Sequence, residues 1–381
     1  MNNLLKGVRV LDFSMYLPGP FASMRLADRG AEVISIEPVQ GDPSRHMGIQ
    51  REGTGVVFLA VNRNKKSVAL DLKSEEGREA VKELIQISDV LIESFRPGVM
   101  ERLGLSYEQS KEWNPGLVYC SISGYGQDTV ALNGFGSHDL NYMALTGMLA
   151  QLTTVEGKPA HPSIQFADYI GSFGACEEIL ASLLHQKETG EGTHIDLALT
   201  DSLHSILGVH SLIHQETGRE YGINELNGGV VCYGIYETLD ERFITLAALE
   251  QSFWRNFCTQ AGKKEWISKQ FSPAKDGSDV FEKMKSLFKS RTFREWSEFS
   301  KRVDCCMAPI LRLSETEDHP VTQERGMFYE LGGGLKQVAT STVFSQKKTM
   351  HPPSIGEHTE EVLTSLLGWP EEKVKRLQSN H

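Results

Sequence analysis

Several features that would assign a functional class at once are missing from this sequence of 381 residues. No stretch approaches about eighteen consecutive apolar residues, so we expect no membrane-spanning helix. The first residues lack the charged and apolar regions of a secretory signal peptide. The net charge of −11 argues against nucleic acid or an anionic membrane as a partner. The sequence therefore predicts a soluble, cytoplasmic protein.

The motifs of several nucleotide, metal and hydrolytic enzymes are missing as well. No GxGxxG follows the first predicted strand and no GxxxxGKS/T occurs, so the usual phosphate loops are absent. The six cysteines show no metal-ligand spacing and no HExxH is present, so we expect free thiols and no bound metal. A GxSxG nucleophile turn is lacking, which argues against serine hydrolysis.

What the sequence does contain is a long alternation of strand and helix patterns. Short apolar runs such as GVRVLDFS, KKSVALDLKS, DVLIESF and GLVYCSISGYG are separated by amphipathic stretches such as EEGREAVKELIQIS. This alternation predicts a doubly wound parallel sheet with crossover helices. We assign residues 1–215 to this large α/β domain.

The pattern changes after Gly218. Apolar and polar residues alternate on both sides of Asp240, which predicts an antiparallel hairpin, and helical segments follow it. We assign 225–325 to a smaller α+β domain. The last segment, 326–381, contains GGG at 332–334 in a predicted hairpin turn and then one amphipathic helical tail, and we expect it to return to the large domain.

Two predicted helices begin at side chains that could act as bases. In GFGSHDLNYMALTG, apolar residues recur at helical spacing after Ser137, which we expect to be the N-cap with His138 at the first helical position. In QFADYIGSFGACEEIL, Asp168 is the expected N-cap. Ordinary capping, for the aspartate, and solvent exposure, for the histidine, would explain both positions without any chemistry.

The same positions also suit catalysis. A helix N-terminus disfavours imidazolium, so His138 is expected to be a neutral base, whereas Asp168 would be held ionised as a base or a nucleophile. First-turn amides near Asp139 could receive a developing oxyanion. Two bases on opposite sides of one carbon suit a racemase, whereas one aspartate suffices for covalent acyl transfer.

A series of sequence blocks resembles the family III CoA-transferase and α-methylacyl-CoA racemase superfamily, the CaiB/BaiF type. The blocks occur in order along the chain, from LPGPFAS, LADRGAEVISIEP and GDPSR through NRNKKSVALDLK, SFRPGVMERLG and NPGLVYCSISGYG to PSIGEHTEEVLTSLLG. The resemblance implies a large α/β domain with a small domain, an interlocked homodimer, and an acyl-CoA substrate. It implies no cofactor beyond the CoA moiety of that substrate.

The resemblance also implies roles for particular residues. In racemases of the superfamily, the residues at the positions of His138 and Asp168 remove and return the α-proton. A glutamate at the position of Glu250 orients the histidine. In transferases, the position of Asp168 forms an aspartyl-CoA thioester. The block SHDLNY favours the racemase branch, whereas SIEPVQGDPSR is more similar to the transferases. The aspartate block FADYIG departs from the usual GDxxGG, which indicates a different local backbone.

CoA binding is implied by the same blocks. The positions that match CoA-lining residues of relatives are Tyr16, Leu17, Pro18, Leu70, Asp71, Leu72, Lys73, Ser94, Phe95, Arg96 and Arg102. Lys73 and the two arginines offer positive charge for phosphates in an acidic chain. The basic run Asn62–Lys66 could add to this charge, although a solvated strand edge is the commoner role of such residues.

The sequence predicts an acyl-CoA α-carbon racemase or epimerase of 2-methyl-branched thioesters. The catalytic set would be His138, Asp168, Glu250 and Asp139. The alternative is an acyl-CoA:carboxylate CoA-transferase, and a third possibility is a non-catalytic CoA-binding homologue. The acyl chain, any acceptor acid, the pathway and the organism stay open.

Overall fold

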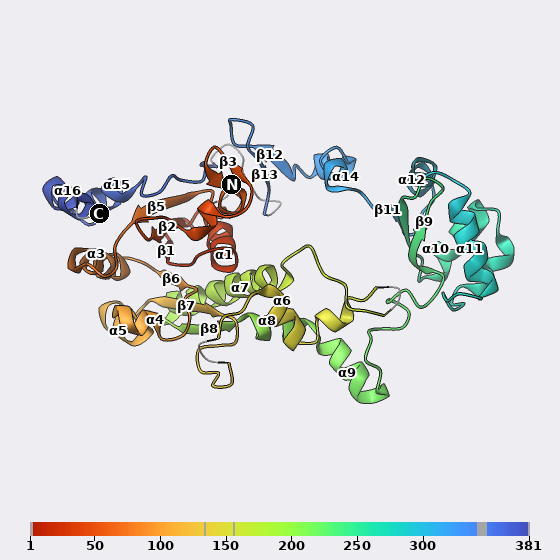
Figure 1. Ribbon diagram of the computed structural model, residues 1–381, viewed down its shortest axis with the longest axis horizontal. Helices are drawn as coiled ribbons and strands as arrows, with labels where there is room; N and C mark the ends of the chain where they lie inside the picture. Colours follow the sequence, from red (N-terminus) through yellow and green to blue (C-terminus); the bar gives the residue numbers. More distant parts are fainter. Residues whose placement is uncertain (1–2, 133–134, 155–156, 341–348, 380–381) are drawn as a thin grey trace. The chain divides into compact units, whose positions relative to one another are not determined.

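The computed structural model describes residues 3–132, 135–154, 157–340 and 349–379 (Figure 1). The chain forms two compact units. The first comprises Met1–Ile206 with Glu324–His381, and the second comprises Leu207–Gln323. The large domain was predicted to end at residue 215, whereas the first part of the first unit ends at Ile206.

A six-stranded sheet of parallel strands lies at the centre of the first unit, with the order β5-β2-β1-β6-β7-β8. Its strands are β1 (Arg9–Asp12), β2 (Glu32–Glu37), β5 (Lys65–Ala69), β6 (Val90–Glu93), β7 (Val118–Ser123) and β8 (His194–Ala198). The predicted parallel α/β architecture is confirmed. The order of the strands reverses between β1 and β6, and in such sheets ligands bind beyond the carboxyl ends of the strands at this point.

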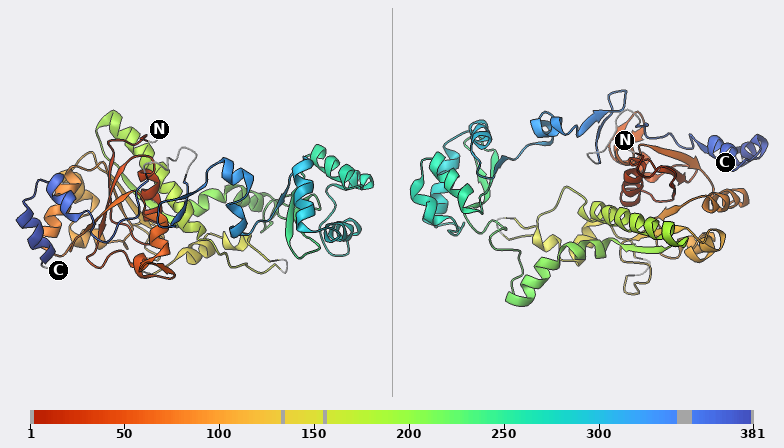
Figure 2. Two further views of the ribbon diagram at one scale, coloured as in Figure 1. Left: turned by 90° about the horizontal axis from the view of Figure 1, so that it is seen from above. Right: turned by 180° about the vertical axis from the view of Figure 1, so that it is seen from behind.

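Helices cover both faces of this sheet, as Figures 1 and 2 show. Because successive side chains of a strand point to opposite faces, Val10 belongs to one buried apolar cluster and Leu11 to the other. Helices α1 (Pro18–Ala27), α7 (Phe166–Thr189) and α8 (Leu199–Ile206) pack on the first face. Helices α3 (Glu75–Gln86), α15 (Thr359–Ser365) and α16 (Glu371–Ser379) pack on the second. The strands are therefore buried on both sides, which explains their continuous apolar runs.

The C-terminal segment covers the outer edge of β5. The N–H of Asn64 donates to the carbonyl of Met350, and the N–H of His358 donates to the carbonyl of Ser67 at 2.9 Å. The prediction of one helical tail is wrong, because α15 and α16 are separate. Gly368, with a φ of 69°, and the following Pro370 end the first helix before the second begins.

The second unit contains the predicted hairpin. Strand β9 (Tyr233–Glu237) pairs antiparallel with β10 (Phe243–Ala247), and β11 (Met307–Pro309) pairs with the other side of β10. The helices of this unit are α9 (Gly208–Thr217), α10 (Gln251–Gln260), α11 (Asp279–Lys289), α12 (Phe293–Arg302) and α13 (Leu313–Thr316), with the 3₁₀ turn η3 (Lys264–Lys269). Buried aromatic side chains, among them Trp254 and Trp296, fill its core.

Smaller elements complete the fold. They are β3 (Gln50–Arg51), β4 (Thr54–Gly55), α2 (Val56–Val61), α4 (Val99–Leu103), α5 (Tyr107–Trp113), α6 (Asp139–Leu145), α14 (Pro320–Glu324), β12 (Phe328–Glu330) and β13 (Lys336–Val338), with 3₁₀ turns η1 (Pro43–His46) and η2 (Leu149–Gln151). The pairing of β12 with β13 confirms the hairpin predicted around GGG. No helix in the described ranges is long and apolar enough to cross a membrane.

Candidate active site

The segments predicted to bind CoA come together at one edge of the sheet. Tyr16–Pro18 follow β1, Leu70–Lys73 follow β5, and Ser94–Arg96 follow β6. Since the carboxyl ends of parallel strands share one edge, these three segments lie at that edge. The N–H of Met15 donates to the hydroxyl of Ser94 at 3.1 Å, which links the β1 and β6 segments across the point where the strand order reverses.

The segment after β1 has a constrained backbone. Tyr16 adopts a φ of 67°, in the left-handed region that non-glycine residues rarely occupy. Its N–H donates to the carboxyl group of Asp42, at 3.2 Å from Oδ2, and its side chain is 46% exposed. The segment after β2, which carries Asp42, therefore helps to hold the one that carries Tyr16. This contact connects residues distant in sequence, so no local pattern could predict it.

Helix α6 begins one residue later than expected. The residue that flanks the helix is His138, not Ser137, and its N–H donates to Oδ1 of Asn141 at 3.0 Å. The hydroxyl of Ser137 instead forms a hydrogen bond with the hydroxyl of Tyr142. His138 is exposed, so its ring is accessible at the start of the helix.

Helix α7 is capped from another helix, and the expected cap by Asp168 is wrong. The helix begins at Phe166, which places Asp168 inside its first turn. The carboxyl oxygen Oδ1 of Asp139 accepts the N–H groups of Ala167, at 2.7 Å, and of Asp168, at 3.2 Å. The start of α6 is thus fastened to the start of α7, and two carboxyl groups of the predicted catalytic set lie in one small region.

The electrostatic state of Asp168 differs from the expectation. Burial, and secondarily the negative charge of Asp139, raise the pKa of Asp168 to about 7. Burial also raises the pKa of Asp139, although its hydrogen bonds from the two amides oppose this. Asp168 was expected to be ionised by the helix N-terminus, but Asp139 takes up two of the amides there and adds a like charge. At neutral pH a substantial fraction of Asp168 therefore holds a proton.

The predicted cationic residues lie on the surface near this edge. Lys73, Arg96 and Arg102 are all exposed. A Cβ atom placed on Gly136 would lie 2.9 Å from Nη2 of Arg96, so the guanidinium group packs against the backbone two residues before His138. Arg96 thus connects the segment after β6 with the segment that carries the histidine.

Two cations of the basic run Asn62–Lys66, Arg63 and Lys65, have neither of the two expected roles, whereas Lys66 is half-buried on the outer strand and pairs with Glu32 and Glu361. Arg63 and Lys65 are 1% exposed. Arg63 donates to both carboxyl oxygens of Asp28, and Nζ of Lys65 donates to Oδ1 of Asn62 at 2.7 Å and forms an ion pair with the buried Asp12 at 3.2 Å. Arg63 and Lys65 form internal ion pairs because Asp28, at the end of α1, and Asp12, in β1, lie beside them.

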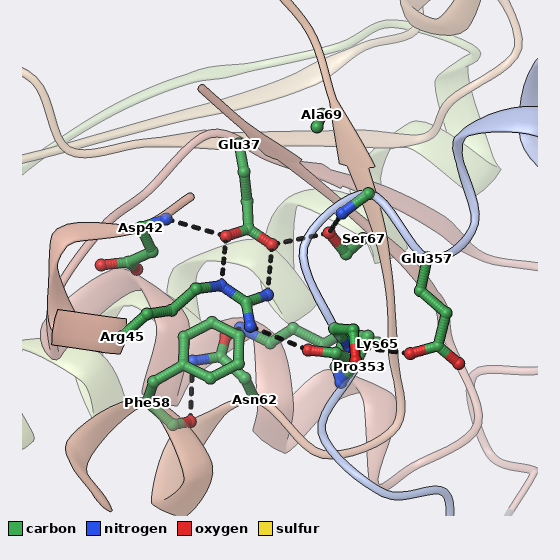
Figure 3. Close-up of polar contacts among 12 residues, drawn as sticks. Glu37, Asp42, Arg45, Phe58, Asn62, Lys65, Ser67, Ala69, Pro353 and Glu357 are labelled. Carbon is green, nitrogen blue, oxygen red and sulfur yellow. Dashed lines mark hydrogen bonds and ion pairs between the residues drawn. The ribbon is translucent and has the colours of Figure 1, made fainter. Parts of the chain in front are cut away.

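The GDPSR block is likewise internal. In Figure 3, the guanidinium group of Arg45 donates to both carboxyl oxygens of Glu37, and Ser67 donates to the same carboxyl group. Nη1 of Arg45 donates to the carbonyl of Pro353 at 2.9 Å, and Cζ of Arg45 lies 3.6 Å from the ring centroid of Phe58. Arg45 therefore joins the C-terminal segment to the sheet and is not placed to meet a phosphate.

Glu250 belongs to the second unit. It is the exposed residue that precedes α10, and its role towards His138 stays a prediction. Sequence reasoning missed several buried acids of the first unit, among them Glu93 at the end of β6. Within DVLIESF it is an ordinary polar residue at a strand end, and no local signal marks it as buried.

The fold and the clustered acids at the carboxyl edge define a parallel α/β protein with a candidate site at the strand-order reversal. The model of CoA-transferase family III matches residues 5–359, and the chain belongs to this family. It is 32% identical to alpha-methylacyl-CoA racemase of Mus musculus, over 99% of this chain and 97% of that protein. The resemblance seen in the sequence blocks is confirmed.

Two further relatives define the range of the family. Succinyl-CoA:glutarate CoA-transferase of Homo sapiens is 29% identical, over 100% of this chain and 90% of that protein. The crystal structure of a CAIB/BAIF family protein from Brucella suis superposes with a TM-score of 0.84 at 26% identity, over 96% of this chain and 100% of that chain. The family thus contains racemases and CoA-transferases whose sequence identity to this chain is similar.

Proposed function

We propose that this protein is an acyl-CoA α-carbon racemase or epimerase that acts on 2-methyl-branched thioesters. The observation that carries the proposal is that Oδ1 of Asp139 accepts the N–H of Asp168, which fastens the start of α6 to the start of α7, while burial and the charge of Asp139 raise the pKa of Asp168 to about 7. His138 immediately precedes Asp139 at the start of α6. An acid that keeps its proton and a nearby histidine form the donor and acceptor that racemisation requires.

The proposed mechanism uses two bases. His138 removes the α-proton from one face of the thioester, and protonated Asp168 delivers a proton to the other face; the reverse reaction exchanges the roles. The enolate oxygen is received by first-turn amides near Asp139, and losing one such donor typically lowers the rate by about 10²–10³. Glu250 supports the imidazolium form of His138. CoA is bound along the edge that carries Tyr16, Lys73 and Arg96.

The proton on Asp168 also separates this function from its alternative. Formation of an aspartyl-CoA thioester begins with attack by the carboxylate, so protonation of Asp168 would lower the reactive fraction. The CoA-transferase alternative is favoured by the relatives of that activity at 29% identity. In that case Asp168 is the nucleophile, His138 only lines the site, and turnover requires an acceptor acid. We also propose that the protein is a homodimer and is located in the cytoplasm.

The deciding experiment is incubation with (2R)- or (2S)-2-methylacyl-CoA in D₂O without any acceptor acid. We expect deuterium at the α-carbon, seen by mass spectrometry, and loss of stereochemical purity, seen by NMR. His138→Ala and Asp168→Asn should abolish both, whereas Lys66→Gln, a change at a residue paired with Glu32 and Glu361, should not.

A different result would select the alternative. Absence of exchange, together with CoA migration once a carboxylic acid is added, would make the protein a transferase. Binding of CoA thioesters with neither reaction would favour a non-catalytic homologue. Exchange by His138→Ala at the wild-type rate would contradict the two-base mechanism.

A further inference from the structure

Glu93, the last residue of β6, is a buried acid that the proposed mechanism does not use. Its side chain is 3% exposed, and in the described ranges it forms no ion pair. Its Oε2 atom accepts the N–H of Phe95 at 2.8 Å, and its carboxyl group also forms a hydrogen bond with Ser121 of β7. A buried carboxyl group without a cation is costly, so its place beside the candidate site calls for an explanation.

The three residues after Glu93 contact three different parts of the first unit. Ser94 accepts the N–H of Met15 at 3.1 Å, from the segment after β1. Phe95 packs against the apolar cluster that contains Leu91. Arg96 lies against Gly136, where an added Cβ would be 2.9 Å from Nη2. One short turn therefore determines where the guanidinium group of Arg96 meets the segment of His138.

We infer that Glu93 is a positioning residue: by accepting the N–H of Phe95, it fixes the turn that presents Arg96 to the thioester end of acyl-CoA. This inference rests on the proposed function, because it assumes that an acyl-CoA lies along this edge. Glu93 itself does not touch the substrate and acts through Arg96.

The protonation of Glu93 indicates which variant should preserve this role. Burial, with smaller effects of Glu101 and Asp196, raises the pKa of Glu93 to about 7, although the hydrogen bonds with Ser121 and Phe95 oppose this shift. A neutral glutamine keeps an acceptor for the N–H of Phe95 at the same chain length. Alanine removes the acceptor, and aspartate withdraws it by one methylene group.

The test is a double-mutant cycle on binding, with 2-methylpropanoyl-CoA titrated into the full-length protein by isothermal calorimetry. Arg96→Ala and Glu93→Ala should each weaken binding about tenfold, and the double variant should be no weaker than about tenfold, because both remove the same contact. Glu93→Gln should bind within about twofold of the wild type. The matched control is Glu101→Gln, which removes an exposed acid of the neighbouring α4 and should also stay within about twofold.

Three results would overturn the inference. The first is a double variant that binds about a hundredfold more weakly than the wild type, because the two effects would then be independent. The others are a Glu93→Ala variant that binds as tightly as the wild type, and a wild-type protein that does not bind the thioester. If Glu93→Ala does not fold, the comparison of Glu93→Asp with Glu93→Gln decides, since only the aspartate should weaken binding.

The exchange reaction of the wild type tests the proposed function separately. Coupled binding effects in a protein without α-proton exchange would keep the positioning role and reject the racemase. α-Proton exchange by a protein in which the two binding effects are additive would support the racemase and reject the positioning role of Glu93.

Discussion

The two helix starts at the candidate site carry similar sequence patterns but provide different environments. At α6, His138 is exposed and the local cap comes from Asn141, three residues further along the same helix. At α7, Asp168 is half-buried, and the cap comes from Asp139 of another helix. The start of α6 is capped by a local contact at an exposed position, whereas the start of α7 depends on a tertiary contact.

The difference teaches that position at a helix N-terminus does not by itself determine the charge of a side chain. The free amides of a first turn normally favour a carboxylate. At α7, burial and the neighbouring charge of Asp139 outweigh this effect and raise the pKa of Asp168 to about 7. The comparison therefore predicts that the two starts respond differently to mutation and to pH.

The largest expected effect is on catalysis. Asp168→Asn and His138→Ala should each lower α-proton exchange by about 10²–10⁴, the usual contribution of general acid–base groups. Both variants should retain binding of the thioester. Exchange is measured by mass spectrometry in D₂O. Loss of exchange in Asp168→Asn but not in His138→Ala would contradict the two-base pairing and leave Asp168 as the only base.

A smaller effect is expected on stability as a function of pH. The pKa of Asp168 rises from its ordinary value of 3.8 to about 7 on folding. Between these values the folded protein keeps a proton that the unfolded chain releases, so this group lowers the free energy of unfolding as pH rises, by up to about 4 kcal/mol. Above about pH 7 the effect is constant.

Urea unfolding of the wild type and of Asp168→Asn at pH 4 and pH 8 measures this effect. The stability advantage of the variant should be larger at pH 8. An advantage that does not change with pH would show that the proton of Asp168 is not held by the fold. His138→Ala serves as the exposed counterpart.

The cap of α7 should contribute less than the titration. Asp139→Ala removes the acceptor for two amides and should destabilise the protein by about 0.5–2 kcal/mol. Asp139→Asn keeps an acceptor and should recover most of that stability. Because it removes the like charge, it should also lower the pKa of Asp168, which a shift of the pH–rate profile to lower pH would reveal. An unchanged profile would contradict the electrostatic role of Asp139.

The smallest effect is expected at the start of α6. Asn141→Ala removes one exposed hydrogen bond, to the N–H of His138, and should reduce stability by about 0.5 kcal/mol. Denaturant midpoints of this variant and of Asp139→Ala give the direct comparison. A larger loss for Asn141→Ala would reverse the order of the two caps.

The sheet, both hairpins and most helices could be predicted because their signals are local. Apolar runs bounded by turns gave the strands, and periodic apolar residues gave α3 and α7. The helical tail was predicted as one element because its apolar period continues across Gly368. Helix boundaries were less accurate, since the cap of α7 is supplied by a residue 28 positions earlier.

The candidate site was predicted in part. The segments after β1, β5 and β6 could be named from their blocks, and a parallel sheet necessarily brings them to one edge. The burial and pairing of Arg63 and Lys65 could not be predicted, since a basic run has the same sequence pattern whether it faces solvent or buried acids. Only the packing of α1 and β1 near β5 supplies Asp28 and Asp12 as partners for these two side chains.

The amino-acid sequence alone determined the layered parallel architecture, its family and the identity of the polar residues at the two helix starts, because these depend on periodicity and on residue type. The tertiary structure decided which of those residues are charged, paired or exposed. The pKa of Asp168 is raised to about 7, Lys65 is buried in an ion pair with Asp12, and Glu93 is buried where it accepts the N–H of Phe95. Each of these follows because solvation and neighbouring charge depend on which distant segments the fold brings together.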